Sequence, residues 1–425
     1  LSISSNAQLR YDRVYLSDDE GNDNKFHQIL DLTVTEKEWN YFRFSLSGDM
    51  VEDVDCKRND EDDRLRNIND TWNYTSHGYL YICQVEMFNY GILNYARLGR
   101  QYVNHELTSH IDGLNLSIST ELYDIKIEPF VYGGLPVHLY EYPDYSEIME
   151  IGGGTHLFIY KTTKITFEHL YIQDIPEIAG TYGDDEKRDY QETVIAARRP
   201  LFNNGYGYAS FKLLDFCPKQ INTMFSFTFE GLSLDVDASY LYQFNEIDKM
   251  SRTTSSYTDL SGKILPHHFI TLDFMKALYK DHLYLSLGTE WRLLSINEDE
   301  TEFNHSYNHE YLAIILDNLP MKGVHLSIQA DYWRTMDSHN QNTVISGGGE
   351  AGYEKSGVYG VQIGSYYSQY KYDYFINKDE ITDVYTIYSR LNYYFKNDLY
   401  IKASYELDIY DIYEHQFSIT IGHQI

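Results

Sequence analysis

The clearest alternation of apolar and polar positions lies at the end of the chain, in residues 399–425. Apolar side chains occupy every second position of residues 399–409, and charged or hydroxyl side chains fill most of the positions between them. Residues 413–425 repeat the pattern after a short link. Because successive side chains of a strand point to opposite faces, this period of two predicts two strands of about 10 residues, each with an apolar and a polar face.

The same alternation, interrupted by turn residues, continues through the rest of the chain. Strands of soluble sandwiches usually have about 5–6 residues, whereas strands of about 10 residues are typical of barrels in lipid. The pattern therefore predicts an all-β protein, a transmembrane antiparallel up-and-down β-barrel of about 22 strands, within a range of about 20–24. The expected strands lie near residues 2–15, 25–35, 38–50, 77–90, 93–103, 109–119, 122–133, 145–159, 163–174, 188–201, 206–216, 219–229, 231–243, 266–277, 281–294, 305–318, 323–335, 342–354, 356–371, 381–395, 397–409 and 413–425.

Every second predicted link is very short, and the links between them are mostly long and acidic. The short links lie near residues 36–37, 90–91, 120–121, 160–163, 202–205, 230–231, 280–281, 320–323, 355–356 and 396–398. Outer-membrane barrels have short periplasmic turns and long extracellular loops. We therefore expect both chain ends on the periplasmic side. No linker or shift of composition divides the chain, so we expect one barrel domain over residues 1–425.

Composition and charge narrow the class further. Of the 425 residues 43% are apolar, the mean hydropathy is −0.47, and no run approaches the roughly 18 apolar residues of a membrane helix. The 43 tyrosines combine an apolar ring with a hydroxyl that binds water, so we expect most of them in two interfacial girdles. A formal net charge of −30 argues against nucleic acid, and outer-membrane lipid is the expected partner. Since Leu1 begins a polar alternating segment, we expect the mature chain of a protein exported by a Gram-negative bacterium.

The charged face of each strand is expected to line the lumen, because a lipid-facing Arg or Lys at mid-bilayer costs roughly 2–4 kcal/mol. Both faces look apolar near residues 79–87 and 311–316, where we expect a loop or a partner to pack against the inner wall. Charged side chains on the polar faces are the candidates for contact with the contents of the lumen. They are Arg97, Lys126, Glu168, Lys212, Asp235, Asp237, Glu290, Arg292, Arg334, Arg390, Lys402 and Glu406.

Acidic residues cluster in the links, near residues 18–23, 52–63, 184–186, 297–302 and 378–383. These segments are either solvated loops or binding sites for divalent cations. His305 with His309, and His267 with His268, lack a third ligand at a suitable spacing, so we expect no metal site in the strands.

The three cysteines, Cys56, Cys83 and Cys217, form no CxxC or CxxCH pattern. Covalent haem on this chain is therefore not expected, and a disulfide between any two of them remains open. No Ser-His-Asp set, carboxylate pair or nucleophile elbow is present, so we expect neither catalytic residues nor an enzyme. The glycine runs 152–154 and 347–349 lack the Lys-Ser/Thr of a phosphate loop, and within strands they permit a bend or a close approach.

The run Arg97-Leu98-Gly99-Arg100-Gln101, followed by residues 112–114, resembles the L-G-R-Q signature of porin-like outer-membrane proteins, which include alginate-export-type channels. Under strict alternation Arg97 and Arg100 lie on opposite faces, so Gly99 is expected at a bulge, a close approach or near a strand end. We expect both arginines to pair with lumen carboxylates. The final strand is similar to the outer-membrane assembly signal, but it ends in Ile425 and not in an aromatic residue.

The expected width of the barrel bears on function. Barrels of 22 strands usually hold a plug, and a plug domain needs on the order of 100 residues, which this chain does not leave over. A large acidic barrel without a plug resembles the barrels of porin–cytochrome conduits. That resemblance implies a periplasmic multihaem cytochrome inside the lumen, an extracellular cytochrome beside it, and haem on the partners only. The alternatives are a passive or substrate-specific porin, with the loop after residue 51 or 244 folded inward, and an enzyme or adhesin with active loops.

Overall fold

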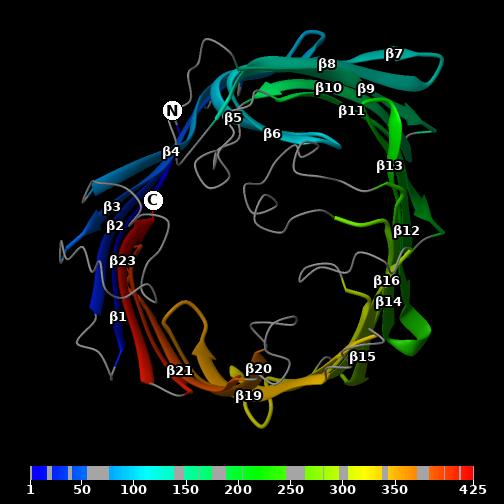
Figure 1. The fold of residues 1–425 in the computed structure, drawn as a ribbon. Coiled ribbons are helices and arrows are strands. Elements are labelled where there is room, and N and C mark those ends of the chain that lie inside the picture. Colours follow the sequence, from blue (N-terminus) through cyan, green and yellow to red (C-terminus); the bar gives the residue numbers. More distant parts are fainter. Residues whose placement is uncertain are drawn as a thin grey trace.

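The computed structural model forms a closed barrel of antiparallel strands around a wide lumen (Figure 1). It describes residues 2–16, 22–36, 41–54, 76–137, 148–160, 162–174, 188–202, 204–245, 264–280, 282–295, 305–336, 343–370, 382–396, 398–410 and 413–424. Within these ranges no helix is long and apolar enough to cross a membrane.

Long strands form nearly the whole described structure, together with one short 3-10 helix at Glu230–Leu232. The strands are β1 (Ser2–Leu16), β2 (Asn22–Thr35), β3 (Phe42–Asp53), β4 (Ser76–Tyr90), β5 (Leu93–Asn104), β6 (Thr108–Ile118), β7 (Thr120–Leu122), β8 (Ile125–Pro136), β9 (Met149–Ile159), β10 (Thr163–Asp174), β11 (Arg188–Leu201), β12 (Gly205–Leu214), β13 (Cys217–Phe229), β14 (Leu234–Gln243), β15 (His267–Tyr279), β16 (Leu283–Leu294), β17 (Tyr307–Asp317), β18 (Val324–Thr335), β19 (Thr343–Lys355), β20 (Tyr359–Tyr370), β21 (Thr382–Tyr394), β22 (Leu399–Ile409) and β23 (Tyr413–Gln424).

The strand count is 22, because β7 continues β6 after one residue and both pair with β8. Each strand pairs with its neighbours in the sequence, and β1 pairs with β23 to close the sheet. The links at one barrel end are short, such as 91–92, 123–124 and 356–358, and both chain ends lie there. The predicted all-β barrel, its strand number and its short-turn end are confirmed, and the described residues contain no plug domain.

Cross-strand partners share a face of the sheet, so the register separates an inner row of side chains from an outer row on every strand. The outer row carries exposed apolar side chains such as Leu98, Ile328 and Ile363, which are 58–66% exposed. The other row carries most of the charges. The assignment is the same all the way around the barrel, because the inner-row residues of β23 pair with the inner-row residues of β1 where the sheet closes. Lipid therefore contacts the apolar row, and the charged row lines the lumen.

Outward aromatic side chains lie near the strand ends. Tyr123, Tyr160 and Phe202 stand at short turns and are 86–92% exposed. Near the other end, Tyr367 and Tyr385 are cross-strand partners on the outer row, with ring centroids 4.9 Å apart. These positions suit rings that sit at a membrane interface.

A second group of tyrosines lies on the inner row. Among the described strands, five of these rings each lie over the glycine directly opposite on the next strand, where no Cβ would fit. Each hydroxyl donates to an acceptor one strand farther on. The tyrosine, glycine and acceptor sets are Tyr132, Gly152 and Glu168; Tyr311, Gly288 and Asp273; Tyr366, Gly348 and Asp331; Tyr388, Gly364 and Glu350; and Tyr400, Gly422 and Asn6. Each ring therefore joins three strands, and the close approach expected at both triple-glycine runs comes from the chain itself.

The apolar character of both faces near residues 79–87 has a local cause. The register of β4 against β3 shifts between Ser47 and Gly48, which leaves Tyr81 as an extra residue. Such a bulge exchanges the inner and outer rows along a strand. Simple alternation across Tyr81 therefore mixes side chains that face the lumen with side chains that face lipid.

Candidate functional site

The hairpin of β5 and β6 leaves the barrel wall and turns into the lumen (Figure 1). β5 pairs with β4 only as far as Arg100, and β6 pairs with β8 only from Ile111 onward. Residues 101–110, which we call the hairpin tip, have no cross-strand partner in β4 or β8, and the His110 carbonyl oxygen accepts a hydrogen bond from the Val137 N–H at 2.9 Å. The link between the two strands, residues 105–107, contains three residues although it lies at the barrel end with the long links.

A row of glycines lies where the hairpin bends. Gly99 of β5 is opposite Gly113 of β6, and Gly113 is opposite Gly134 of β8. Gly99 has φ of 117°, and a Cβ at any of the three would collide with backbone of the neighbouring strand. Only glycine fits such a close approach with this backbone. The three strands can therefore approach closely where the wall folds inward.

Apolar side chains hold the tip against the inner wall. Val103, Leu107 and Ile111 are at most 4% exposed. They belong to one buried cluster with side chains of β8, β10 and β11, and residues of β12 pack against its edge. Burying a side chain of this size contributes about 1.5–3 kcal/mol, because the alternative is exposure to water in the lumen.

Glu168 of β10 fixes the tip by hydrogen bonds. Its Oε2 accepts from the backbone N–H groups of Glu106 and Leu107 at 2.9 and 3.1 Å. Its Oε1 accepts from the Tyr132 hydroxyl at 2.8 Å. The carboxylate is fully buried, so these three donors replace the water that it would bind in an open lumen.

Glu106 forms a second attachment at the end of the tip. Its Oε1 lies 2.7 Å from Nη2 of Arg198 on β11, and its Oε2 accepts from the Tyr208 hydroxyl of β12 at 3.1 Å. The Arg198 guanidinium also lies over the Tyr208 ring, 5.2 Å from its centroid. The two attachments tie the tip to three neighbouring wall strands.

His105 is the third tip residue with polar contacts. Its Nε2 lies 3.1 Å from the Tyr95 hydroxyl, its Nδ1 lies 3.2 Å from Nε2 of His156, and its ring stacks on Phe130 at 3.8 Å. Burial, reinforced by the charges of His156 and of nearby basic side chains, lowers the pKa of His105 to about 3. The imidazole is therefore neutral at pH 7.

The opposite face of the hairpin carries half-buried polar side chains. Arg100 donates two hydrogen bonds to the Asp112 carboxylate, at 2.8 and 2.6 Å, and a third to the Leu80 carbonyl oxygen at 3.0 Å. His110 donates to the carbonyl oxygen of Tyr81 at 2.8 Å. The hairpin is thus tethered to β4 at the bulge, where the two strands have stopped pairing.

Charge is unevenly distributed around the lumen. On β1–β12 the described inner rows balance acidic against basic side chains, and several of these form ion pairs. On β14–β23 eleven carboxylates face only three basic side chains, Arg292, Arg390 and Lys402. The eleven, which we call the acidic arc, are Asp235, Asp237, Asp273, Glu290, Asp317, Asp331, Glu350, Glu354, Glu406, Asp408 and Glu414.

The twelve lumen candidates from the sequence do not form one site. Arg97 pairs with Glu86 at 2.7 Å, Lys126 with Glu128 at 2.5 Å, and Lys212 lies 4.0 Å from Glu192. Glu168 is buried under the hairpin tip. The others on the inner row belong to the strands of the acidic arc. They are Asp235, Asp237, Glu290, Arg292, Arg390, Lys402 and Glu406.

The register places Arg334 differently from the prediction. It is opposite Asn308 and shares the outer row with Ile328 and Tyr332. It is exposed and lies next to the last residue of β18. A charge is compatible with the outer row there, because the strand end lies away from the middle of the bilayer.

Sequence reasoning missed the residues that attach the hairpin, namely His105, Glu106, Tyr132 and Arg198. The available signal was the short link at 105–107, flanked by glycines 99 and 113 and by apolar residues at its ends. Arg97 pairs with Glu86 of the inner row, whereas Arg100 pairs with Asp112 on the row that also carries Leu98. Arg100 is the last β5 residue paired with β4.

Other predictions concern residues outside the described ranges. The acidic links lie mostly there, as do Cys56 and most residues of the loops after 51 and 244. Cys83 and Cys217 are free thiols. Within the part of the chain that the structure describes, no three His, Cys, Asp or Glu side chains gather as metal ligands.

Comparisons with known proteins support the fold. No protein-family model and no curated protein matches the chain. The structure of the P pilus usher (PapC) translocation pore is similar over 100% of both chains, with a TM-score of 0.50 and 8% identity. Acinetobacter baumannii OccAB4 is similar over 100% of this chain and 99% of its own, with a TM-score of 0.47 and 8% identity. Pseudomonas aeruginosa OpdK with vanillate is similar over 100% and 98%, with a TM-score of 0.43 and 8% identity.

The similarity to the usher pore shows the fold alone. The similarities to OccAB4 and OpdK are weaker, and no argument is based on them. The closed sheet, its apolar outer row, its charged inner row and its two unlike ends define an outer-membrane β-barrel. The protein crosses a bacterial outer membrane with its strands, and its short turns face the periplasm. The resemblance of residues 97–101 to the L-G-R-Q signature stays a prediction.

Proposed function

We propose that this protein is a channel for small hydrophilic solutes, in which the hairpin tip is a fixed constriction. The observation that carries this proposal is the attachment of the tip to β8, β10, β11 and β12 inside the lumen. An element held by a buried apolar cluster and two sets of hydrogen bonds stays in place without a partner. It narrows the passage in the way that an inward loop narrows a porin.

The test is conductance in planar lipid bilayers. Replacing residues 102–110 with Asn-Gly joins Gln101 and Ile111, which are cross-strand partners, through a favoured two-residue turn. The shortened protein is expected to conduct more than the wild type, and its barrel is expected to stay intact. If the shortened protein and the wild type conduct equally, the tip does not narrow the passage. If the wild type does not conduct, the channel proposal is refuted.

A second candidate is a sheath around an inserted multihaem cytochrome that carries electrons across the membrane. It is favoured by the width of a 22-strand barrel, and by the limitation of the buried cluster to the β5–β12 side in the described part of the chain. In that case the acidic arc contacts the guest, and haem belongs to the guest. A haem-stained second polypeptide that survives purification in mild detergent from the native membrane supports the sheath. A colourless preparation that conducts ions excludes it.

A further inference from the structure

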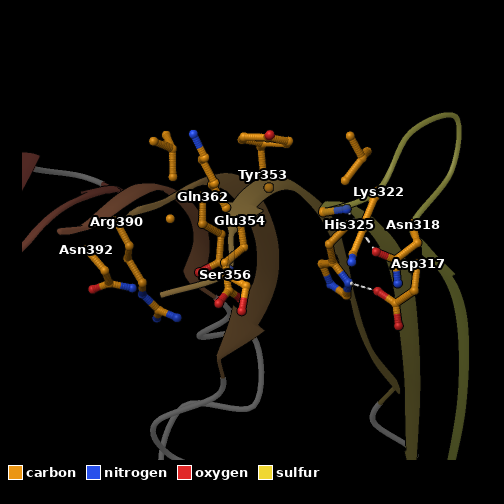
Figure 2. Close-up of a pocket in the computed structure, with 16 residues that line it drawn as sticks. Asp317, Asn318, Lys322, His325, Tyr353, Glu354, Ser356, Gln362, Arg390 and Asn392 are labelled. Carbon is orange, nitrogen blue, oxygen red and sulfur yellow. Dashed lines mark hydrogen bonds and ion pairs between the residues drawn. The ribbon is translucent and has the colours of Figure 1, made fainter. Parts of the chain in front are cut away.

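A groove of about 850 Å³ lies on the inner wall at the periplasmic mouth, away from the hairpin tip. Its walls come from the ends of β17, β18, β19, β20 and β21 and from their short turns. Figure 2 shows Arg390 and Asn392 on one side of the groove, and His325 with Asp317 on the other. The volume is in the range of sites that hold small organic molecules.

One end of the groove offers hydrogen-bond donors for which the described residues provide no acceptor. Arg390 and Asn392 stand two residues apart on the inner row of β21. The guanidinium lies over the Tyr388 ring at 5.0 Å, and no carboxylate of the described residues pairs with it. Guanidinium groups bind carboxylates through two parallel hydrogen bonds, so this end suits an anionic group.

The other end carries charges of both signs, because Asp317 lies there together with Lys322 and His325 (Figure 2). The Asp317 carboxylate lies 2.6 Å from Nδ1 of His325, and Nε2 of the same ring lies 3.2 Å from Glu350. The Asp317 side chain is 40% exposed, which leaves oxygen lone pairs for a donor in the groove. Glu354 lies between the two ends (Figure 2). Asp317 is the acceptor that this end offers to an ammonium group, and Lys322 is the competing cation in the lining.

Glycines make the floor of the groove. Gly352 and Gly360 occupy inner-row positions, opposite Gln362 and Glu354. A Cβ at Gly360 would have no atom nearer than 3.8 Å, so a side chain fits there without a clash. The hollow therefore results from two missing side chains, and a larger residue at 360 would fill it.

We propose that this groove binds a zwitterionic solute of the size of a short peptide. The carboxylate end contacts Arg390 and Asn392, and the ammonium end contacts Asp317. The inference rests on the proposed function, because a solute reaches the groove by way of the lumen. The described inner row on this side is mostly acidic, and Arg390, which pairs with no described carboxylate, supplies the positive charge that a solute carboxylate needs.

The test is isothermal titration of the detergent-purified protein with the dipeptide Ala-Ala. N-acetyl-Ala-Ala keeps only the carboxylate, and Ala-Ala amide keeps only the ammonium. Ala-Ala is expected to bind at least tenfold more tightly than either. Arg390→Gln should remove the preference over the amide, Asp317→Asn should remove the preference over the acetylated peptide, and Gly360→Leu should abolish binding.

Arg10→Gln is the matched control, because Arg10 is on the inner row of β1 outside the groove, and it should bind as the wild type does. Bilayer conductance of every variant reports whether the barrel is intact. The inference is overturned if a conducting wild type binds the three peptides equally or not at all, or if Arg390→Gln binds normally. If the protein binds Ala-Ala selectively but does not conduct, the channel proposal is refuted and the groove is supported as a binding site.

Discussion

Glu168 shows how one lumen side chain is used by the protein itself. A carboxylate on the inner row is expected to face solvent or a guest, but here it accepts two backbone N–H groups of the hairpin and one tyrosine hydroxyl. Because it is fully buried, its removal would leave three donors without an acceptor. Each buried group left in that state costs about 1–3 kcal/mol.

Glu168→Ala should therefore release the hairpin tip. The readout is the maleimide reaction of a Ser109→Cys probe, with the three native cysteines replaced by serine, because Ser109 is 5% exposed while the tip is docked. The labelling rate should rise roughly tenfold or more, since about 1.4 kcal/mol corresponds to a factor of ten. Asp235→Ala, which removes an inner-row carboxylate far from the tip, should leave the rate unchanged. Equal rates for both variants would contradict the role of Glu168.

His105 makes docking of the tip depend on pH. Its pKa is near 6.5 in a released tip and about 3 in the docked one, so the docked state binds fewer protons between these values. The docking free energy is therefore complete above about pH 6.5 and falls by up to about 1.4 kcal/mol per pH unit below it. The charges of His156, Lys164, Arg97 and Glu106 also act on the pKa of the ring.

Labelling of the Ser109→Cys probe, divided by that of an exposed Thr108→Cys probe, should rise as the pH falls from 7.5 to 5.5. The ratio corrects for the pH dependence of thiol reactivity. His105→Gln should remove most of the slope. A slope that survives this substitution would assign the effect to another group.

At the scale of elements, the wall combines two devices that use glycine. The glycine row at residues 99, 113 and 134 lets three strands approach closely where the hairpin turns inward. The tyrosine rings that lie over opposite glycines stiffen the wall and do not bend it, because each ring joins three neighbouring strands. Both devices need the absence of a Cβ, but only the first needs unusual backbone angles.

Gly364→Val should destabilise the barrel more than Tyr388→Phe does. A valine at 364 has no room beside the Tyr388 ring, and such overpacking costs about 1–3 kcal/mol. Tyr388→Phe removes only the hydroxyl that donates to Glu350. The measurement is the temperature at which the folded, fast-migrating band is lost on a gel. Gly364→Val with Tyr388→Ala should recover part of the loss, and no recovery would argue against the ring contact as its cause.

At the scale of the whole molecule, the acidic arc gives the lumen a negative side that faces a neutral one. Permeant cations are attracted to such a wall, and the attraction weakens as salt screens it. The hairpin tip occupies the neutral side, so under the proposed function solutes that pass the tip travel along the arc.

The channel should therefore prefer K⁺ over Cl⁻ in a salt gradient across a bilayer. Asp235→Asn with Asp237→Asn and Asp273→Asn removes three neighbouring carboxylates of the arc and should shift the reversal potential toward zero. Asp12→Asn is the matched control, because Asp12 lies on the balanced side and is paired with Arg10 at 2.8 Å. A reversal potential that depends equally on Asp12 would refute the uneven distribution of charge.

The alternation of side chains by itself determined the barrel, its number of strands and its short-turn end, because a period of two over ten residues is a local property of each strand. Turn residues marked the short links for the same reason. The predicted faces agree with the register at eleven of the twelve lumen candidates, and Arg334 is the exception. Alternation is also ambiguous around the bulge at Tyr81, because a single extra residue changes every later position.

Only the tertiary structure decided what lies in the lumen. The contact between Glu106 and Arg198 joins residues 92 positions apart, and the bond from Tyr400 to Asn6 closes the barrel across 394 positions. The groove at the periplasmic mouth likewise gathers residues from five strands. Alternation assigns each side chain to a face, but which side chains meet across that face depends on the closure and register of the whole sheet.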